Sequence, residues 1–237
     1  MPRFFEQAPT DIVTLMGETA SHISRSLRMR VGEHITLCDN GVDADCVIES
    51  VGEEVVVRVL SRKPNESEPT VKTTLYQCVP KGDKLETVIQ KAVELGVDRV
   101  VPVLSKRCVS RPDEKSAKKK SVRYNKIALE SCKQSGRGKV VEVGEMITLD
   151  KAFENSKNDD CAMLFYECGG EKLSDKIVPQ SGSCSLFIGP EGGFDEMEVE
   201  KAKANGIHIC TLGPRILRTE TAPLAALCCV MIYSNNI

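Results

Sequence analysis

The sequence has few of the features that mark metal sites or membrane spans. Its 237 residues include only three histidines, which lie far apart (His22, His34 and His208). None of the 11 cysteines are paired in a C-x-x-C spacing, so the usual zinc patterns are absent. The longest apolar stretch, residues 223–233, is too short to span a bilayer, and the N-terminus has no apolar signal core. We therefore expect a cytoplasmic protein with no metal and no membrane partner.

Three common catalytic and nucleotide-binding motifs are also missing. There is no G-x-x-x-x-G-K-[ST] phosphate loop and no G-x-S-x-G nucleophile elbow. Residues 136–141 begin a G-x-G-x-x-G pattern but lack its third glycine, and they precede an expected strand instead of following one. Most cysteines lie in apolar runs, which indicates small buried side chains. Any ligand pocket is therefore expected to form without a metal or a phosphate cradle.

Positive charge is concentrated in one part of the chain. The formal net charge is −2, but residues 105–139 contain 12 Lys and Arg against 3 Asp and Glu, a local charge of +9. Such a positive field suits a phosphate-rich partner. A solvated helix face beside a Lys-rich loop is the alternative, and the charge pattern alone does not decide between the two.

The first part of the chain is mostly β in pattern. Short runs rich in β-branched residues, 33–38, 44–49 and 54–60, are separated by turn residues and preceded by an expected short helix over 21–30. Their spacing suits a small barrel or sandwich. Residues 61–69 are polar and contain two prolines, which is typical of a linker. We expect a first domain over residues 1–72.

Residues 73–237 alternate between strand and helix patterns, which predicts a mostly parallel sheet with helices on both faces. Asp83 and Asp195 each precede a helical pattern and have a glutamate three residues later, as in a helix-capping pair. The expected strands are 73–79, 100–104, 140–143, 161–166, 185–188 and 207–212, and the expected helices are 83–95, 113–133, one from Asp195, and 221–234.

Two of these strands end in Gly-Pro turns that are surrounded by polar residues. Residues 185–188 lead into GPEGGF at 189–194, and residues 207–212 lead into GPRILRTETA at 213–222. Ligands of open α/β sheets bind at the carboxyl ends of strands, where such loops meet. Glycine permits positive φ and close approach of backbone to a ligand. The paired turns therefore predict one small-molecule pocket built from two loops.

The segments 187–194 and 212–222 closely resemble those of the bacterial 16S rRNA N3-methyluridine methyltransferases, the RsmE family of the SPOUT class. Residues 94–97 (ELGV), 134–137 (QSGR) and 21–39 are similar too, so the resemblance covers essentially the whole chain. It implies an α/β fold in which a SPOUT-type, trefoil-knotted methyltransferase domain (73–237) follows a small PUA-like β-barrel domain (1–72) that helps hold RNA.

The resemblance also implies an activity. The protein would be a homodimeric enzyme that uses S-adenosyl-L-methionine to methylate N3 of one uridine in 16S rRNA, within the assembled small ribosomal subunit. Two alternatives remain at this point: a SPOUT enzyme with another RNA target, such as a ribose 2′-oxygen, and a non-catalytic rRNA-binding or assembly protein.

Site residues follow from the matched motifs. For catalysis, Arg218 is expected to stabilise charge on the uracil, while Glu191 or Glu220 accepts the N3 proton; capping of the last helix or pairing with Arg215 is the alternative role for Glu220. Cofactor contacts are expected at Leu164, Tyr166, Glu167, Ile188, Gly189, Pro190, Glu191, Gly192, Gly193, Leu212, Gly213, Ile216, Leu217, Arg218, Thr221 and Ala222. RNA contacts are expected at Arg3, Arg25, Arg28, Lys106, Arg107, Arg111 and Arg137.

Overall fold

The computed structural model describes residues 1–173 and 182–237, and these form two compact units. The N-terminal unit consists of residues 1–68 together with 132–140, and the C-terminal unit of residues 69–131 and 141–237. The first boundary lies close to the expected one at residue 72. Residues 132–140, far along the chain, also belong to the N-terminal unit, although residues 73–237 were expected to form the second domain.

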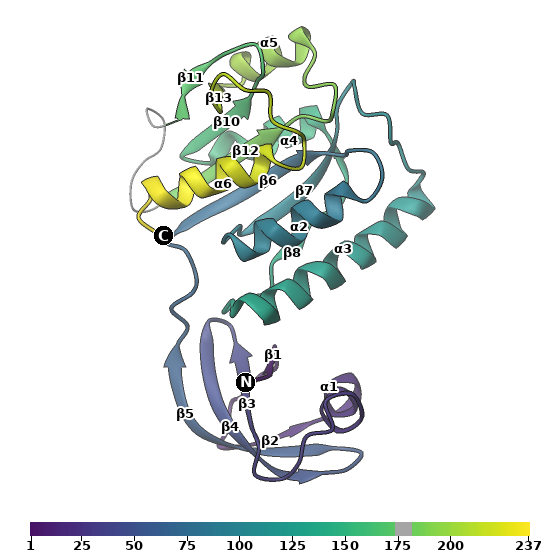
Figure 1. The fold of residues 1–237 in the computed structure, drawn as a ribbon, viewed down its shortest axis with the longest axis vertical. Helices are drawn as coiled ribbons and strands as arrows, with labels where there is room; N and C mark the ends of the chain where they lie inside the picture. Colours follow the sequence, from purple (N-terminus) through teal and green to yellow (C-terminus); the bar gives the residue numbers. More distant parts are fainter. Residues whose placement is uncertain (174–181) are drawn as a thin grey trace. The chain divides into compact units, whose positions relative to one another are not determined.

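A five-stranded sheet forms the N-terminal unit, in the order β1-β3-β4-β5-β2 (Figure 1). The three expected strands are present as β3, β4 and β5, and the two short edge strands β1 and β2 were not predicted. Strand β5 also continues into the expected linker, since Pro64 pairs with Val42 of β4. The bounds are β1 Arg3–Phe4, β2 Ile12–Leu15, β3 His34–Asp39, β4 Val42–Val51 and β5 Val55–Pro64.

The core of this unit lies between the sheet and one short helical segment. Ala20 and Ile23, both fully buried, pack in one cluster with Ile35 and Leu37 of β3. The helix expected over residues 21–30 is instead an α-helical turn, α1 (Gly17–Ser21), that continues as a π-turn, η1 (His22–Ser26). It ends before Arg28, whose φ of 52° is left-handed and incompatible with a continuing helix.

Residues 132–140 are attached to the N-terminal unit by backbone and side-chain bonds. The Gly41 N–H donates to the Gly138 carbonyl oxygen at 2.8 Å. Arg137, which is 3% exposed, donates from Nε and Nη2 to both carboxylate oxygens of Glu68, each at 2.9 Å. A buried two-point arginine–carboxylate pair fixes position as well as distance, so this segment is a structural part of the unit.

An all-parallel sheet forms the C-terminal unit, in the order β11-β13-β10-β12-β6-β7-β8, with β9 also pairing β7. This confirms the expected parallel α/β architecture. The bounds are β6 Val71–Cys78, β7 Arg99–Leu104, β8 Glu142–Val143, β9 Ile147–Thr148, β10 Cys161–Phe165, β11 Glu171–Lys172, β12 Gly182–Ile188 and β13 His208–Thr211.

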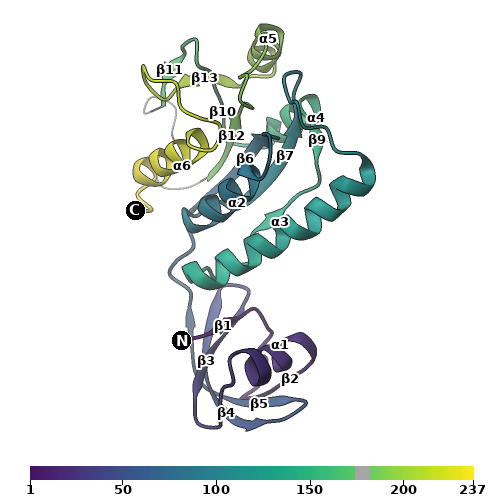
Figure 2. The same ribbon diagram turned by 45° about the vertical axis from the view of Figure 1, so that its right-hand side comes forward.

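Helices cover both faces of this sheet (Figures 1 and 2). Helices α2 (Lys84–Glu94) and α6 (Ala222–Tyr233) contact each other over one face. On the other face, α4 (Leu149–Asn155) and α5 (Glu196–Ala204) join a core cluster with Tyr76 and Phe187, whose rings stack at 4.6 Å. Helix α4 was not predicted.

Helix α3 (Glu114–Ser135) confirms the helix expected over residues 113–133 and contains the Lys-rich run 115–120. Lys115, Lys118 and Lys119 are exposed on that helix. In the two ranges that the structure describes, no helix is both long and apolar enough to cross a membrane.

Candidate active site

The ends of four parallel strands meet at one edge of the C-terminal sheet. Gln77 of β6, Ile188 of β12, Phe165 of β10 and Cys210 of β13 are register partners in one row across these strands. The loops that follow them therefore begin at the same level. The three loops that carry the expected cofactor contacts, 164–167, 188–193 and 212–222, therefore lie at the same edge.

The loop after β12 turns back on itself within five residues. The Gly193 N–H donates to the Pro190 carbonyl oxygen at 2.9 Å, and Gly193 has a left-handed φ of 64°. A β-carbon at residue 189 would lie 3.2 Å from the Gly193 backbone, which is closer than an ordinary contact. The left-handed φ favours glycine at residue 193, and the close approach of the backbone favours it at residue 189.

A buried hydrogen-bond relay joins this turn to the loop after β13. The Thr219 hydroxyl donates to the Gly189 carbonyl oxygen at 2.8 Å and accepts a hydrogen bond from Gln77 Nε2 at 3.2 Å. Thr219 is 6% exposed and Gln77 is fully buried. Neither residue was among those predicted from the sequence. The available signal was a single amide in the otherwise apolar end of β6, LYQCV at 75–79.

Lys84 holds the two glutamates that were candidates for accepting a proton. Its Nζ lies 3.1 Å from Glu191 Oε1 and 3.3 Å from Glu220 Oε2. Burial alone raises the pKa of Glu191, but hydrogen bonds from its own backbone N–H, from Lys81 N–H and from Lys84 outweigh it and hold that pKa below its usual range. Such a carboxylate is a weak base, which counts against Glu191 as the proton acceptor.

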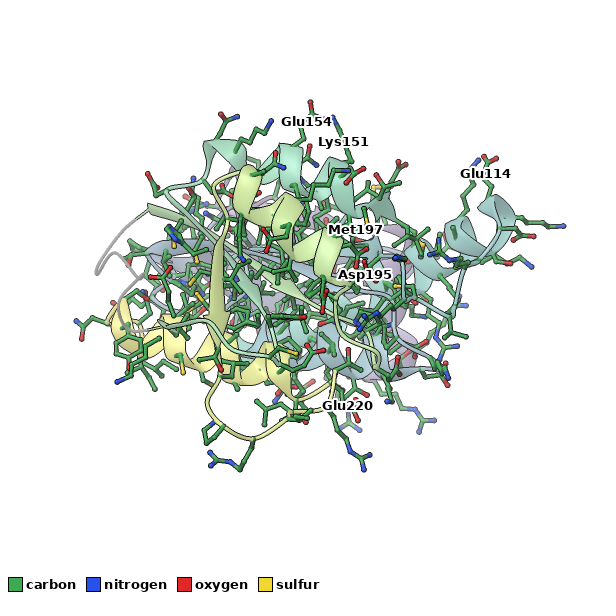
Figure 3. The ribbon with its side chains drawn as sticks, turned by 90° about the horizontal axis from the view of Figure 1, so that it is seen from above. Glu114, Lys151, Glu154, Asp195, Met197 and Glu220 are labelled. Carbon is green, nitrogen blue, oxygen red and sulfur yellow. The ribbon has the colours of Figure 1, made fainter. Side chains whose placement is uncertain are left out.

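The roles first considered for Glu220 also change. Its partner is Lys84 instead of Arg215, and the N-terminus of α6 at Thr221 has no side-chain cap. Glu220 lies in the loop that precedes α6 and is labelled in Figure 3. The two glutamates and Lys84 therefore form an ionic link among the β12 loop, the β13 loop and α2.

A second set of contacts joins the glycine turn to α5 and to the loop after β7. Arg107 Nη1 donates to the Gly192 carbonyl oxygen at 2.8 Å, and Lys106 Nζ lies 3.0 Å from Asp195. Asp195, labelled in Figure 3, forms the expected capping box with Glu198 at the start of α5. The similar pair at Asp83 is wrong as a prediction, because no side chain caps α2.

The predicted cofactor residues differ in how much of each is available. Leu164 and Ile188 are buried in the sheet, so only their backbone is positioned for a ligand. Leu212 and Leu217 are half-buried, while Ile216 is 84% exposed and Arg218 is exposed. The exposed side chain of Ile216, in the loop after β13, could cover an apolar ring of a bound ligand.

The predicted RNA-contact residues divide into two groups. Arg137 is buried against Glu68, and Arg3 donates to both carboxylate oxygens of Asp43 at 2.6 and 2.8 Å. Their guanidinium groups are already paired with carboxylates, which counts against phosphate contact by these two residues. The other five, Arg25, Arg28, Lys106, Arg107 and Arg111, are exposed.

An open cavity of about 710 Å³ lies along β13 and α5. Its lining includes Tyr166, Cys168, Glu171, Lys203 and His208. Of the predicted site residues its lining contains only Tyr166, and no residue of the turns at 189–193 and 213–214 lines it. The shape of the surface alone would place a ligand in this cavity. The hydrogen-bonded relay and the ionic link, however, connect the three loops at the strand ends.

Comparison with known proteins identifies the family of the chain. A family model for an RNA methyltransferase domain matches residues 66–231, and one for an RNA methyltransferase PUA domain matches residues 15–60. Ribosomal RNA small subunit methyltransferase E of Bacillus subtilis is 38% identical over 231 residues, covering 94% of this chain and 90% of that protein. The chain belongs to the ribosomal RNA small subunit methyltransferase E family.

Other members of the family match over nearly the whole chain. The Mesomycoplasma hyopneumoniae ribosomal RNA small subunit methyltransferase E is 30% identical, with 94% of this chain and 96% of that protein covered. A crystal structure of the Neisseria gonorrhoeae enzyme, bound to S-adenosyl methionine, is 33% identical with a TM-score of 0.88, covering 98% and 97% of the two chains. Membership therefore extends to both units, and it identifies the N-terminal sheet as the PUA domain.

Proposed function

We propose that this protein transfers the methyl group of S-adenosylmethionine to N3 of one uridine in 16S rRNA of the small ribosomal subunit. The supporting observation is the pair of Gly-Pro loops, held side by side by Thr219 and Lys84 at the carboxyl edge of the sheet. The related Neisseria gonorrhoeae enzyme has been crystallised with S-adenosyl methionine.

The residues around the two loops fit that cofactor. The exposed Ile216 and the half-buried Leu212 and Leu217 are suited to cover an adenine ring. The glycine turn at 189–193 offers backbone groups at close range, and the exposed Glu167 beside it supplies an acceptor for hydroxyl or ammonium groups. When bound, the cofactor supplies a methyl group that is already activated on a sulfonium, so no protein nucleophile is needed.

The chain itself would orient the uridine and manage charge. Alignment of the two reactants is a large part of the rate enhancement in a transfer of this kind. Arg218 projects from the β13 loop as an exposed cation, and we propose that it stabilises negative charge on the uracil as N3 loses its proton. Because N3 lies on the Watson–Crick edge, the target base has to be unpaired or flipped out of its stack.

Three features of the family's architecture are part of the same proposal. The C-terminal segment would be threaded as a trefoil knot, and the protein would act in the cytoplasm as a homodimer. Helix α6 supports the dimer, since it leaves Ile232 and Tyr233 58% and 46% exposed at its end and is apolar almost throughout. Sedimentation of the free protein tests the dimer directly, and a monomer at micromolar concentration would reject it.

A methylation assay tests the activity. Small subunits from a strain that lacks the modification are incubated with labelled S-adenosylmethionine, and the product nucleoside is identified. We expect 3-methyluridine at one position. Label in a ribose 2′-oxygen would indicate a different RNA-modifying activity, and absence of both transfer and cofactor binding would indicate a non-catalytic rRNA-binding protein.

A further inference from the structure

Gln77 occupies an unusual position for an amide. It is fully buried near the end of β6, where its neighbours Leu75, Tyr76 and Cys78 are buried too. Its Nε2 donates to two acceptors, Thr219 Oγ1 at 3.2 Å and the Cys78 carbonyl oxygen at 3.1 Å. Both amide hydrogens are therefore used, one within its own strand and one toward the β13 loop.

The direction of the relay follows from the chemistry of its members. The Gly189 carbonyl can only accept, so the Thr219 hydroxyl gives its single proton to that oxygen at 2.8 Å. The hydroxyl oxygen must then accept from Gln77, which fixes the orientation of the amide. A chain of donors thus runs from β6 through the loop after β13 to the first peptide of the loop after β12.

The amide oxygen of Gln77 makes this buried position energetically unfavourable. Gln77 Oε1 is buried and has no hydrogen-bond partner among the described residues. Buried polar atoms are almost always paired, and an apolar side chain of similar size would avoid the loss. Local rules of this kind are broken mainly at functional sites. The unfavourable burial therefore suggests that Gln77 is present for its hydrogen bond to Thr219, which positions the Gly189 peptide.

We propose that Gln77 and Thr219 act as one pair of positioning residues that sets the Gly189 peptide, and with it the shape in which the two Gly-Pro loops receive the cofactor. This inference rests on the proposed function. Neither residue is assigned to touch the cofactor. Gln77 acts through Thr219, and Thr219 acts through the Gly189 carbonyl. Gly189 is the first residue of the tight turn that ends at Gly193.

Near-isosteric variants of the full-length protein test the relay. The Thr219→Val change removes the hydroxyl and keeps the shape, while Thr219→Ser keeps the hydroxyl. The Gln77→Leu change removes the donor. Thr73→Val is the matched control, because Thr73 is also fully buried in β6, two pleats away on the same side, and its hydroxyl has no partner among the described residues. Calorimetry gives the Kd for S-adenosylmethionine, and thermal unfolding gives Tm.

We expect Thr219→Val and Gln77→Leu each to raise the Kd about tenfold, while Thr219→Ser and Thr73→Val stay within about twofold of the unmodified protein. Because the two residues act in series, the double variant should also lose about tenfold and not a hundredfold. A rise in Kd that the serine variant does not reverse, or single losses that multiply, would overturn the inference.

Stability separates this role from a purely structural one. Thr73→Val should keep or raise Tm, because it removes a buried hydroxyl that has no partner among the described residues. A Kd that rises in Thr219→Val but not in Thr219→Ser, at a similar Tm, supports loop positioning; equal Kd values in Thr219→Val and Thr73→Val would reject it. Should Gln77→Leu fail to fold, the valine and serine variants at Thr219 still decide. An unmodified protein that binds no S-adenosylmethionine would reject the proposed function itself, whereas normal binding with unaffected variants rejects only the relay.

Discussion

The carboxylate of Glu167 fills the space that a side chain on Gly193 would need. A β-carbon at residue 193 would lie 2.7 Å from Glu167 Cδ, well inside any normal contact. Gly193 also has a φ of 64°, in the left-handed region. These two constraints are separable, because one belongs to the local backbone and the other to a loop that follows a different strand.

Gly193→Ala should therefore reduce cofactor affinity by more than backbone strain alone explains. Alanine in a left-handed conformation costs about 1 kcal/mol, and the added methyl group also displaces Glu167 from the β12 loop. We expect the Kd for S-adenosylmethionine, measured by calorimetry, to rise at least tenfold.

Gly206→Ala is the matched control for that change. Gly206 has a φ of 77°, but nothing lies within 4 Å of the position its β-carbon would take. It should lose a similar amount of stability, about 1 kcal/mol, and keep its cofactor affinity. Equal effects of the two substitutions on the Kd would show that Glu167 has no part in the site.

Glu191→Gln should leave methyl transfer nearly intact. Its carboxylate is held below its usual pKa by backbone N–H groups and Lys84, so it remains ionised and is a poor acceptor for the uridine proton. We expect kcat to fall less than about threefold, and the pH–rate profile between pH 6 and 9 to keep its shape. A loss of a hundredfold or more, with an inflection removed, would restore Glu191 as the base.

Arg218→Ala should have the opposite signature. If the guanidinium acts on charge that develops on the uracil, its loss lowers kcat and leaves the Kd of the cofactor almost unchanged. A fall of about a hundredfold in kcat is expected from the loss of one such stabilising group. Cofactor affinity that falls as steeply as turnover would assign Arg218 to cofactor binding instead.

The regular elements were predictable because their signals are local. Strand and helix patterns placed β6, β12, α2 and α5 within a few residues, and the two Gly-Pro turns identified the edge where the loops meet. The missed elements, such as β1 and β9, are two residues long. Pairings that short carry no periodic signal and depend on neighbours that are distant in sequence.

The side-chain partners within the site were less predictable, again for a physical reason. Lys84 lies 107 residues before Glu191, and Gln77 lies 142 residues before Thr219. The sequence around a lysine or a glutamine does not show that its side chain will bind such a distant loop. Arg137 was predicted to face a phosphate, whereas it is buried. Its burial depends on the ion pair with Glu68, which is 69 residues away in the sequence. The distribution of charged residues in a sequence predicts the local electrostatic potential better than it predicts which side chains form ion pairs.

The Arg137–Glu68 pair should be the most sensitive ionic contact of the N-terminal unit. Removing one member of a buried pair leaves the other charge without compensation, which costs about 3 kcal/mol. Arg137→Met should therefore speed hydrogen exchange in β3 and β4. Arg58→Met, in the exposed pair with Glu49, should have an effect of less than about 1 kcal/mol. Similar exchange in both variants would show that Arg137 is not structural.

Acidification should reduce the stability that this pair provides. Burial alone raises the pKa of Glu68, but the hydrogen bonds and charge of Arg137 outweigh it, so the folded-state pKa lies below the usual value of 4.5. The stabilisation is thus fully present above about pH 5 and is lost as the pH falls through the folded-state pKa. In Arg137→Met the same burial should raise that pKa instead. The difference in unfolding free energy between the two proteins, measured in urea, should therefore begin to shrink above pH 4.5, where the Glu68 carboxyl of the variant takes up its proton. It should keep shrinking as the pH falls through the lower folded-state pKa of the unmodified protein. A difference that stayed constant down to about pH 3 would mean that Glu68 is not the group held by Arg137.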